Sequence, residues 1–366
     1  MNKKALVLLG ALCLGATVGC NNNDTSSSSS PAASQSKEYK VGLGYSASFK
    51  YDQATVNVAV AAFEDGKILN ARLDVVQIPL TVGNIAEDGE PEDLSGVINT
   101  EAKNGTALLS KVELGTDYNM LFASKIEKEV YEQIEAFAAW TVGKTVEEVV
   151  AGTPGAGHGT AVNDELASSV TIGVDDFEAA LNDAYATAVV VDELTAANAG
   201  VGIYVEMYNS NELTTYIAGS ISDANGKVEK ALIDNVVMPL DAGDVVVENE
   251  DTGEEETITG AILSKPSKYI AEDGSFVSKK KLGEDYKMDD FYPSCTEDWY
   301  KQAAHIEDYL VGKTQAEVAA FTTDAEGKTD LISGATIKVD AIFNSIKEAV
   351  DYATKDVITS KPVAAA

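Results

Sequence analysis

The sequence predicts an α+β protein in which one domain occurs twice, after a signal peptide and a flexible tether. Three observations predict this class. The chain repeats itself at shifts of 160 to 169 positions, each copy has strand-like alternation followed by helix-like periodicity, and the first 37 residues show neither pattern. Strands followed by helices indicate segregated layers. We place the two domains at residues 38–197 and 198–358, before a short tail at 359–366.

Residues 1–19 have the pattern of an export signal. Two lysines precede the apolar run Ala5–Val18, which is too short to span a bilayer as a stable helix. Thr17–Cys20 resembles the lipobox of bacterial lipoproteins, in which the cysteine is diacylated and becomes the new N-terminus. We therefore expect lipidation at Cys20 and a place on the extracytoplasmic face of the cell membrane. The alternative is an ordinary secretory signal with an incidental cysteine.

Residues 20–37 predict a tether. They consist mainly of Asn, Ser, Ala and Gln and include the serine run Ser26–Ser30. Such a composition buries too little apolar surface to fold. We expect this segment to hold the first domain near the membrane while letting it move.

Composition excludes several classes of protein. The formal net charge of -32 repels nucleic acid, so no nucleic-acid partner is expected. Only Cys295 remains outside the signal and the lipidation site, which excludes an internal disulfide. The two histidines, His158 and His305, do not align between the copies, and the sequence contains no metal-binding cluster and no Ser-His-Asp set.

Each copy is expected to begin with strands and continue with helices. Alternating apolar residues predict strands at Thr55–Val60 and Gly202–Met207, and Asp65-Gly66 and Asn225-Gly226 predict hairpin turns followed by a further strand. Apolar residues at helical spacing then follow in each copy. The helices are expected at Ile126–Thr141 and Thr296–Leu310.

A Gly-Lys-Thr triplet occurs in each copy, beginning at Gly143 and Gly312. A phosphate-binding P-loop would need a glycine five positions earlier, where Ala138 and Glu307 stand. We interpret each glycine as the end of one helix and each threonine as the cap of the next. The predicted capping boxes are Thr145–Glu148 and Thr314–Glu317.

The segment Asp330–Thr336 near the end of the second copy is the strongest candidate for a functional site. It precedes a predicted helix with one apolar stripe. From periodicity alone Thr336 is an ordinary helix N-cap. A helix N-terminus also suits a phosphate, however, and Gly334 and Ala335 leave room around the hydroxyl. The stripe consists of Val339, Ile342, Phe343, Ile346 and Val350.

Asp330–Thr336, with the Gly-Lys-Thr upstream, resembles the FMN-binding domain of Rnf and sodium-translocating quinone reductase subunits, whose signature is Asp-x-x-Ser-Gly-Ala-Thr. In that family a flavin transferase uses FAD to attach FMN to the final threonine as a phosphoester. The resemblance implies that Thr336 carries covalent FMN. It also implies that a recognition turn is formed by Asp330, Ser333, Gly334 and Ala335.

The first copy has a weaker version of this motif at Glu165–Thr171. Thr171 is the candidate for a second FMN, although Val170 could obstruct the turn and the transferase. The alternative is a degenerate copy kept for packing or for contact with a partner. The helix expected after it carries the stripe Val174, Phe177, Leu181 and Ala184.

A flavin ring also needs a surface on which to pack. Tyr286 and Met288 repeat Tyr118 and Met120 at the same spacing. Aromatic and thioether groups pack well on flat rings. These residues are therefore candidate flavin contacts, with a role in the core as the alternative.

The resemblance implies an electron carrier, similar to extracellular electron-transfer flavoproteins. Its partners would be the flavin transferase, an electron donor in the membrane and extracellular electron acceptors. We expect the acidic surface to lower the flavin potential. The alternatives are a surface-binding lipoprotein that uses the duplicated fold without flavin, and a reductase that acts on a small acceptor.

Overall fold

The structure, a computed structural model, describes residues 37–50, 53–80, 98, 108–154, 157, 159–209, 211–248, 253–288, 292, 295 and 297–353. The predicted signal peptide, Cys20, the tail and all of the tether but Lys37 lie outside these residues, as does His158. In the described part of the chain, no helix has the length and apolar character needed to cross a membrane. The described residues from Lys37 onward belong to one compact unit.

The first half of this unit has three long strands, one short strand and a set of helices. The strands are β1 (Tyr39–Lys50), β2 (Gln53–Glu64), β3 (Lys67–Pro79) and β4 (Val189–Val191). The helices are α1 (Lys111–Leu114), the 3-10 turn η2 (Gly115–Tyr118), α2 (Val130–Thr141), α3 (Val146–Gly152) and α4 (Asp175–Ala186).

The second half repeats the order of three strands followed by helices, but its fourth strand comes before the helices, whereas β4 comes after them. Its strands are β5 (Asn198–Tyr208), β6 (Glu212–Ser222), β7 (Val228–Glu248) and β8 (Glu255–Ser264). Its helices are α5 (Lys279–Leu282), the 3-10 turn η3 (Gly283–Tyr286), α7 (Trp299–Leu310), α8 (Gln315–Ala319) and α9 (Asp340–Ala353). The mixture of strands and separate helices confirms the α+β class.

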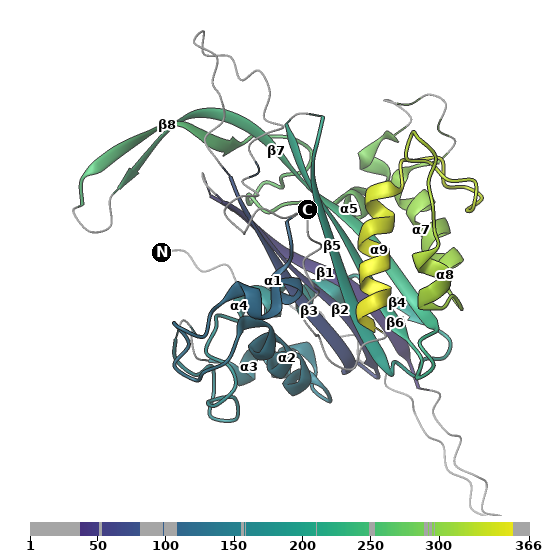
Figure 1. Ribbon diagram of the computed structural model, residues 1–366, viewed down its shortest axis with the longest axis horizontal. Helices are drawn as coiled ribbons and strands as arrows, with labels where there is room; N and C mark the ends of the chain where they lie inside the picture. The colour runs from purple at the N-terminus through teal and green to yellow at the C-terminus, as the bar shows by residue number, and fades with distance from the viewer. Residues whose placement is uncertain are drawn as a thin grey trace, which may run out of the picture. The chain divides into compact units, whose positions relative to one another are not determined.

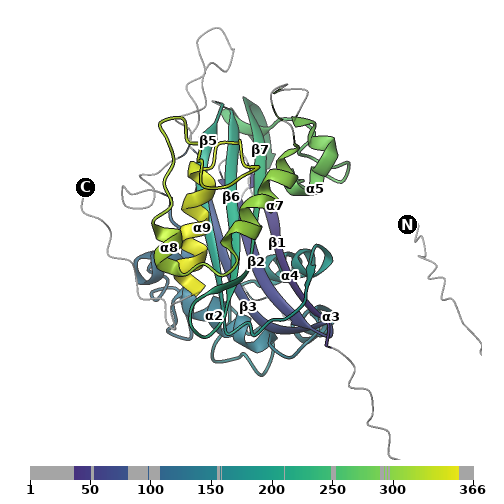
Figure 2. The same cartoon turned by 90° about the vertical axis from the view of Figure 1, so that its right-hand side faces the viewer.

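Two antiparallel sheets pack against each other, and helices cover the outer surface of each (Figure 1). The strand orders are β3-β2-β1-β4 and β5-β6-β7-β8. Val56 and Val58 of β2 enter the core between the sheets, whereas the alternate residues Ala59 and Ala61 face the helices of the first half. Figure 2 shows α7 and α9 lying over the sheet of the second half.

Three strands of each half match in register. A register shift occurs between Ala62 and Phe63 where β2 pairs with β3, and an equivalent shift occurs between Ile221 and Ser222 where β6 pairs with β7. The hairpin turn at Asp65-Gly66 has the predicted position, and both residues adopt positive φ. The turn at Asn225-Gly226 is longer, because the Asp223 carboxylate accepts hydrogen bonds from the backbone N–H of Asn225 and Lys227.

The sequence located only one of the first two strands in each half. Thr55–Val60 lies in β2, the middle strand of its hairpins, whereas Gly202–Met207 lies in β5, the first strand of the second half. The two stretches are therefore not equivalent. β1 and β6 were not predicted, because β1 contains Gly and Ser at alternate positions and β6 is apolar or buried on both faces.

Glycine pairs let the last helix of each half approach its first strand closely. A Cβ at Gly44 would lie 2.1 Å from the backbone N of Ala184 in α4, and a Cβ at Gly202 would lie 1.9 Å from the backbone O of Ser345 in α9. Only glycine allows this approach. Gly200 and Gly202 on β5 therefore determine where α9 lies, and with it the segment that contains Thr336.

Both predicted middle helices begin later than expected. α2 begins at Val130 and α7 at Trp299, three or four residues after the predicted starts. Glu127 has a φ of 53°, which interrupts a helix before it. The Glu129 carboxylate accepts a hydrogen bond from Met120 N at 2.8 Å, so this residue joins the preceding loop to the helix start.

The Gly-Lys-Thr triplets end one helix and cap the next, as predicted. Gly143 and Gly312 have φ of 83° and 80°, and both predicted capping boxes are present. The N–H of Gly143 donates to the carbonyl of Ile68, and that of Gly312 donates to the carbonyl of Val228. These triplets tie helix ends to the sheets.

Candidate functional site

Thr336 lines a cavity of about 590 Å³ in the second half, which we call the Thr336 cavity. Its walls come from β5, β6, β7, α5 and the segment before it, η3, α7 and the segment before α9. Six aromatic side chains line it: Tyr208, Tyr216, Tyr269, Tyr286, Tyr292 and Trp299. Four lysines also line it: Lys268, Lys279, Lys328 and Lys338.

The Thr336 hydroxyl is positioned by α7 and does not cap α9. The Gln302 amide oxygen accepts hydrogen bonds from the backbone N–H of Thr336 at 2.8 Å, from its hydroxyl at 3.1 Å and from the N–H of Ile337 at 3.1 Å. α9 begins only at Asp340. Thr336 is exposed, so its hydroxyl is held in place and remains accessible.

The start of α9 is less suited to a phosphate than the sequence suggested. The Asp340 carboxylate lies in the first turn and accepts a hydrogen bond from Ala341 N at 3.0 Å. A carboxylate in this place already interacts with the positive end of the helix. Lys328 and Lys338 are better candidates for phosphate contact. They lie on two adjoining segments, where Val339 N donates to the carbonyl of Gly327 at 2.7 Å.

The small residues before Thr336 serve the turn itself. Gly334 has a φ of 90°, and a Cβ there would lie 2.5 Å from Cδ2 of His305. Ala335 is buried in the helical core. Asp330 and Ser333 are exposed and do not line the cavity. Of the predicted site residues in this half, the cavity brings together Thr336, Tyr286 and Met288.

Two lysines lie against the Tyr286 ring. Lys268 Nζ is 4.1 Å from the ring centroid and donates to the Tyr286 carbonyl at 2.7 Å. Lys279 Nζ is 5.5 Å from the same centroid and 6.0 Å from that of Trp299. Burial, followed by repulsion from Lys268, lowers the pKa of Lys279 to about 8, against an attraction to Glu212. The ammonium ions thus lie beside aromatic faces.

Burial keeps three tyrosines of the cavity neutral at physiological pH. Burial raises the pKa of Tyr208 to about 12, and it also raises the pKa of Tyr269 and of Tyr286. The rings of Tyr269 and Tyr286 are 6.4 Å apart. Met288 is buried and belongs to both the cavity wall and the core, so its role in the core is confirmed and it remains a candidate flavin contact.

These residues fit an FMN. Lysines suit its phosphate, aromatic and thioether groups suit its ring, and the Thr336 hydroxyl lies on the same cavity. One buried polar atom also favours a ligand in this cavity. The amide oxygen of Asn235, which is 2% exposed and lines the cavity, has no hydrogen-bond partner among the described residues. A buried acceptor of this kind is normally satisfied.

The first half has a corresponding cavity of about 470 Å³, which we call the Thr171 cavity. The Gln133 amide oxygen accepts from the N–H of Thr171 at 2.8 Å, from its hydroxyl at 3.3 Å and from the N–H of Ile172 at 3.2 Å. The hydroxyl is held as in the second half. Thr171, however, is only 8% exposed, and Val170 beside it is fully buried.

The lining of the Thr171 cavity also differs in charge. Tyr118 and Met120, the candidate ring contacts of this half, line it. Its one lysine is Lys111, and it carries the carboxylates of Asp175 and Asp176. The Thr336 cavity has four lysines and two glutamates, so the two halves present opposite charge to an anionic ligand.

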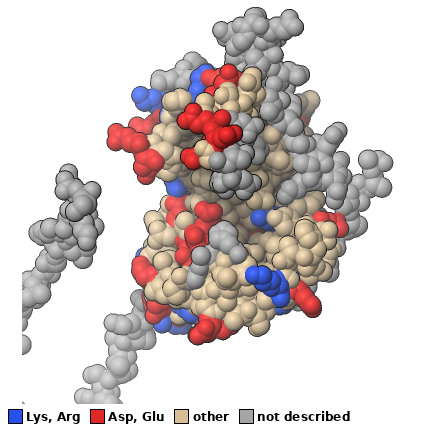
Figure 3. Space-filling model, turned by 90° about the vertical axis from the view of Figure 1, so that its left-hand side faces the viewer, with Lys and Arg blue, Asp and Glu red and all other residues tan. Residues whose placement is uncertain are grey.

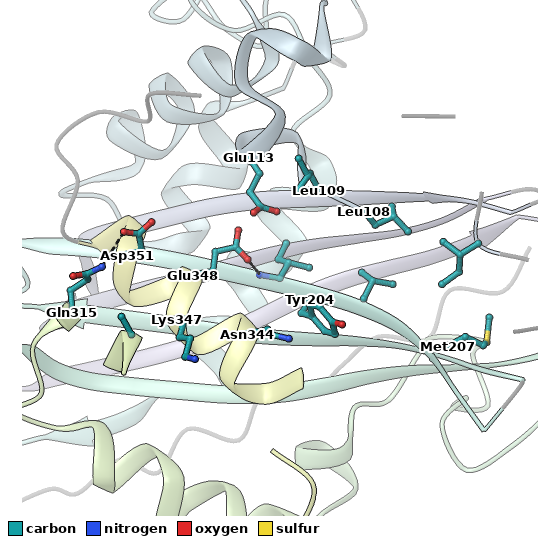
Figure 4. Close-up of a pocket in the computed structure, with 14 residues that line it drawn as sticks. Leu108, Leu109, Glu113, Tyr204, Met207, Gln315, Asn344, Lys347, Glu348 and Asp351 are labelled. Atoms are coloured by element: carbon teal, nitrogen blue, oxygen red, sulfur yellow. Dashed lines mark hydrogen bonds between the residues drawn. The ribbon is translucent and has the colours of Figure 1, made fainter. Parts of the chain in front are cut away.

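A third cavity, of about 730 Å³, lies between the two halves and is acidic (Figure 4). It is lined by Glu113 of α1 and by Glu348 and Asp351 of α9. The Glu348 carboxylate accepts from Ile203 N at 3.0 Å, and Gln315 donates to Asp351 at 3.5 Å. These carboxylates serve strand and helix contacts and do not suit a phosphate.

The chain has many more acidic than basic residues, so a cavity lined by four lysines differs in charge from most of the protein. Figure 3 shows separate clusters of Asp and Glu on one face, with lysines scattered between them. Among the described residues, no group of three His, Cys, Asp or Glu side chains could hold a metal ion.

Some site residues were missed by the sequence analysis. Gln133 and Gln302 stand at the same shift of 169 as the triplets that follow them, so the repeat itself could have identified them. The lysines could not be found in this way. Lys268 is far in the chain from Lys328 and Lys338, and it lines one cavity with them only in the fold.

Comparisons with known proteins returned no match to any protein-family model, any curated protein or any solved structure.

Proposed function

We propose that this chain is a lipid-anchored, extracytoplasmic flavoprotein with two tandem FMN-binding domains, which carries electrons through an FMN attached to Thr336. One observation carries the proposal. An exposed threonine hydroxyl, within an Asp-x-x-Ser-Gly-Ala-Thr segment, lies on a cavity lined by aromatic rings and lysines in a strongly acidic protein.

The attachment reaction requires an accessible hydroxyl. The resemblance implies that a flavin transferase uses FAD as the donor. The Thr336 oxygen then bonds to the phosphorus of the FMN portion, the bond between the two phosphates of FAD breaks, and AMP leaves with the hydroxyl proton. Gln302 holds the hydroxyl in place for this step, because its amide oxygen accepts the hydrogen bonds from Thr336.

The protein supplies the surroundings, and the bound FMN supplies the redox chemistry. Lys328 and Lys338 favour the phosphate through their charge, and Tyr286, Met288 and Trp299 offer a surface for the ring. Lys268 and Lys279 place positive charge beside that surface.

We propose a single flavin, on the second half. Thr171 is buried, whereas Thr336 is exposed. The Thr171 cavity carries two aspartates, which would repel a phosphate. The first half then serves as a packed partner of the second, because the sheets of the two halves share one core.

A flavin that is covalently held, on a protein attached to the membrane at Cys20, cannot diffuse away. This favours repeated transfer from a membrane donor to extracellular acceptors. The alternatives are a surface-binding lipoprotein without flavin and a reductase with its own small acceptor.

Coexpression with and without a flavin transferase tests the proposal. We expect yellow protein whose band fluoresces in a denaturing gel only when the transferase is present. A colourless product under both conditions favours the surface-binding lipoprotein. Turnover of a small acceptor by the flavinylated protein alone favours the reductase.

A further inference from the structure

The side-chain amide oxygen of Asn235 is buried without a hydrogen-bond partner in the described part of the chain. Asn235 lies on β7, is 2% exposed and lines the Thr336 cavity. Its backbone N–H donates to the Asp234 carboxylate at 2.7 Å, but no described residue donates to its amide oxygen. A buried acceptor left without a donor lowers stability. We therefore expect a ligand in the cavity to donate a hydrogen bond to this amide oxygen.

The polar neighbours of Asn235 are engaged elsewhere. Tyr216, its partner across the β6–β7 pair, donates its hydroxyl to the Glu206 carboxylate at 2.7 Å. The Asp234 carboxylate accepts from the Ser278 hydroxyl at 2.6 Å and from Lys280 N at 3.0 Å, which holds α5 in place. These contacts anchor the wall of the cavity and leave the amide to face it.

The first half shows that the sheet itself does not need an amide at this position. The equivalent residue is Val75 on β3, which is 4% exposed and lines the Thr171 cavity. The preceding residue, Asp74, makes the same anchor, because its carboxylate accepts from the Ser110 hydroxyl at 2.6 Å. The scaffold is thus the same, and an amide occurs at this position of the third strand only in the half with the exposed threonine. The Thr171 cavity carries its buried amide on the neighbouring strand, at Asn57, which pairs with Val75.

We propose that Asn235 orients the flavin ring by pairing its amide with an adjacent N–H and C=O of the isoalloxazine. This inference rests on the proposed function. An amide offers one donor and one acceptor side by side, and Asn pairs in the same way with adjacent groups on a nucleobase edge. Rotation about the last side-chain bond lets the cavity meet either atom of the amide. The ring faces are left to the aromatic residues and Met288.

The test compares Asn235→Val with the wild type, each with and without attached flavin. Valine is the residue of the first half, and it removes the unsatisfied acceptor. We expect the flavin-free variant to melt at the same temperature as flavin-free wild type or higher. Attachment of flavin should raise the melting temperature of the wild type, and this rise should fall by at least half in Asn235→Val. The fluorescence anisotropy of the attached flavin should fall as well, because the ring is held less firmly.

Ser220→Ala is the matched control. Ser220 lies on β6, is fully buried, has a hydroxyl without a partner among the described residues and does not line the Thr336 cavity. Its removal should shift both forms equally and leave the flavin-induced rise unchanged.

Three outcomes overturn the inference. An equal flavin-induced rise and equal anisotropy in Asn235→Val and wild type would show that the amide does not touch the flavin. A flavin-free Asn235→Val that melts well below wild type would show a structural role. Wild type that attaches no flavin would remove the proposed function as well, which distinguishes that failure from the first two.

Discussion

The Thr336 and Thr171 cavities share one scaffold and differ in nearly everything that a ligand would meet. In both, a glutamine on the middle helix accepts three hydrogen bonds from the threonine segment, and a buried aspartate holds the helical turn that carries a lysine. Only the Thr336 cavity combines an exposed threonine, four lysines and an unsatisfied amide. The two halves thus share an architecture and differ in the chemistry of their cavities.

The largest expected effect tests which threonine carries the flavin. Thr336→Val should lose all covalent flavin, because it removes the only exposed hydroxyl of the two. Thr171→Val should retain it in full. Flavin absorbance of the denatured and desalted proteins measures both. Retention of flavin by Thr336→Val, or loss of half by Thr171→Val, would remove the proposed difference between the halves.

The second prediction concerns pH and the buried aspartates. Burial raises the pKa of Asp74 to about 7, and the nearby Glu113 raises it further. Burial also raises the pKa of Asp234, but there Lys280 opposes the rise. Since the folded state then binds a proton more tightly than the unfolded state, the unfolding free energy should fall as pH rises from about 4 to 7. The expected loss at Asp74 is about 2 to 4 kcal/mol.

Asp74→Asn stays neutral and should lack this part of the pH dependence, while its amide keeps the contact with Ser110. Urea unfolding of wild type, Asp74→Asn and Asp234→Asn at several pH values checks the prediction. The Asp234 variant should change the slope less. Identical slopes in the wild type and Asp74→Asn would contradict it.

The third prediction transfers a residue of the first half into the second. Gly334→Ser introduces the residue that stands at position 169, at a φ of 90° and against the His305 ring. We expect a loss of about 1–3 kcal/mol in unfolding free energy and of most flavin attachment. Adding His305→Ala, which copies Ala136 of the first half, should recover part of the stability by relieving the contact. A Gly334→Ser protein with normal stability and full flavin would show that the glycine is dispensable.

The smallest effect concerns the flavin potential. Lys279→Met removes an ammonium beside the Tyr286 ring and should disfavour the reduced, anionic flavin about tenfold, or about 30 mV for a two-electron couple. Lys111→Met removes the same charge from the Thr171 cavity and should leave the potential unchanged. Equal shifts in the two variants would indicate that only net charge matters. High salt should raise the wild-type potential slightly, because it screens the acidic surface.

Much of the scaffold could be predicted from local sequence. The apolar stripes of α4 and α9 and both capping boxes follow from helical spacing and from side chains three residues apart. The helix starts could not, since Glu127 takes a positive φ and Glu129 bonds to a residue nine positions away. β6 could not be predicted either, because it is buried on both faces and shows no alternation of apolar and polar residues.

The candidate site was predicted in part. The repeat and the motif led to Thr336, Tyr286 and Met288, which line one cavity. Long-range contacts decided the rest. Sequence alone does not show that His305 packs on Gly334, that Asp340 occupies the start of α9 or that Asn235 lines the cavity.

Intact-mass analysis of the mature protein from its native host, followed by peptide mapping, tests the central claim most directly. We predict the mass of the acylated polypeptide plus one FMN, located on the peptide that contains Thr336. A mass without FMN, or a flavin located on the peptide that contains Thr171, would contradict it.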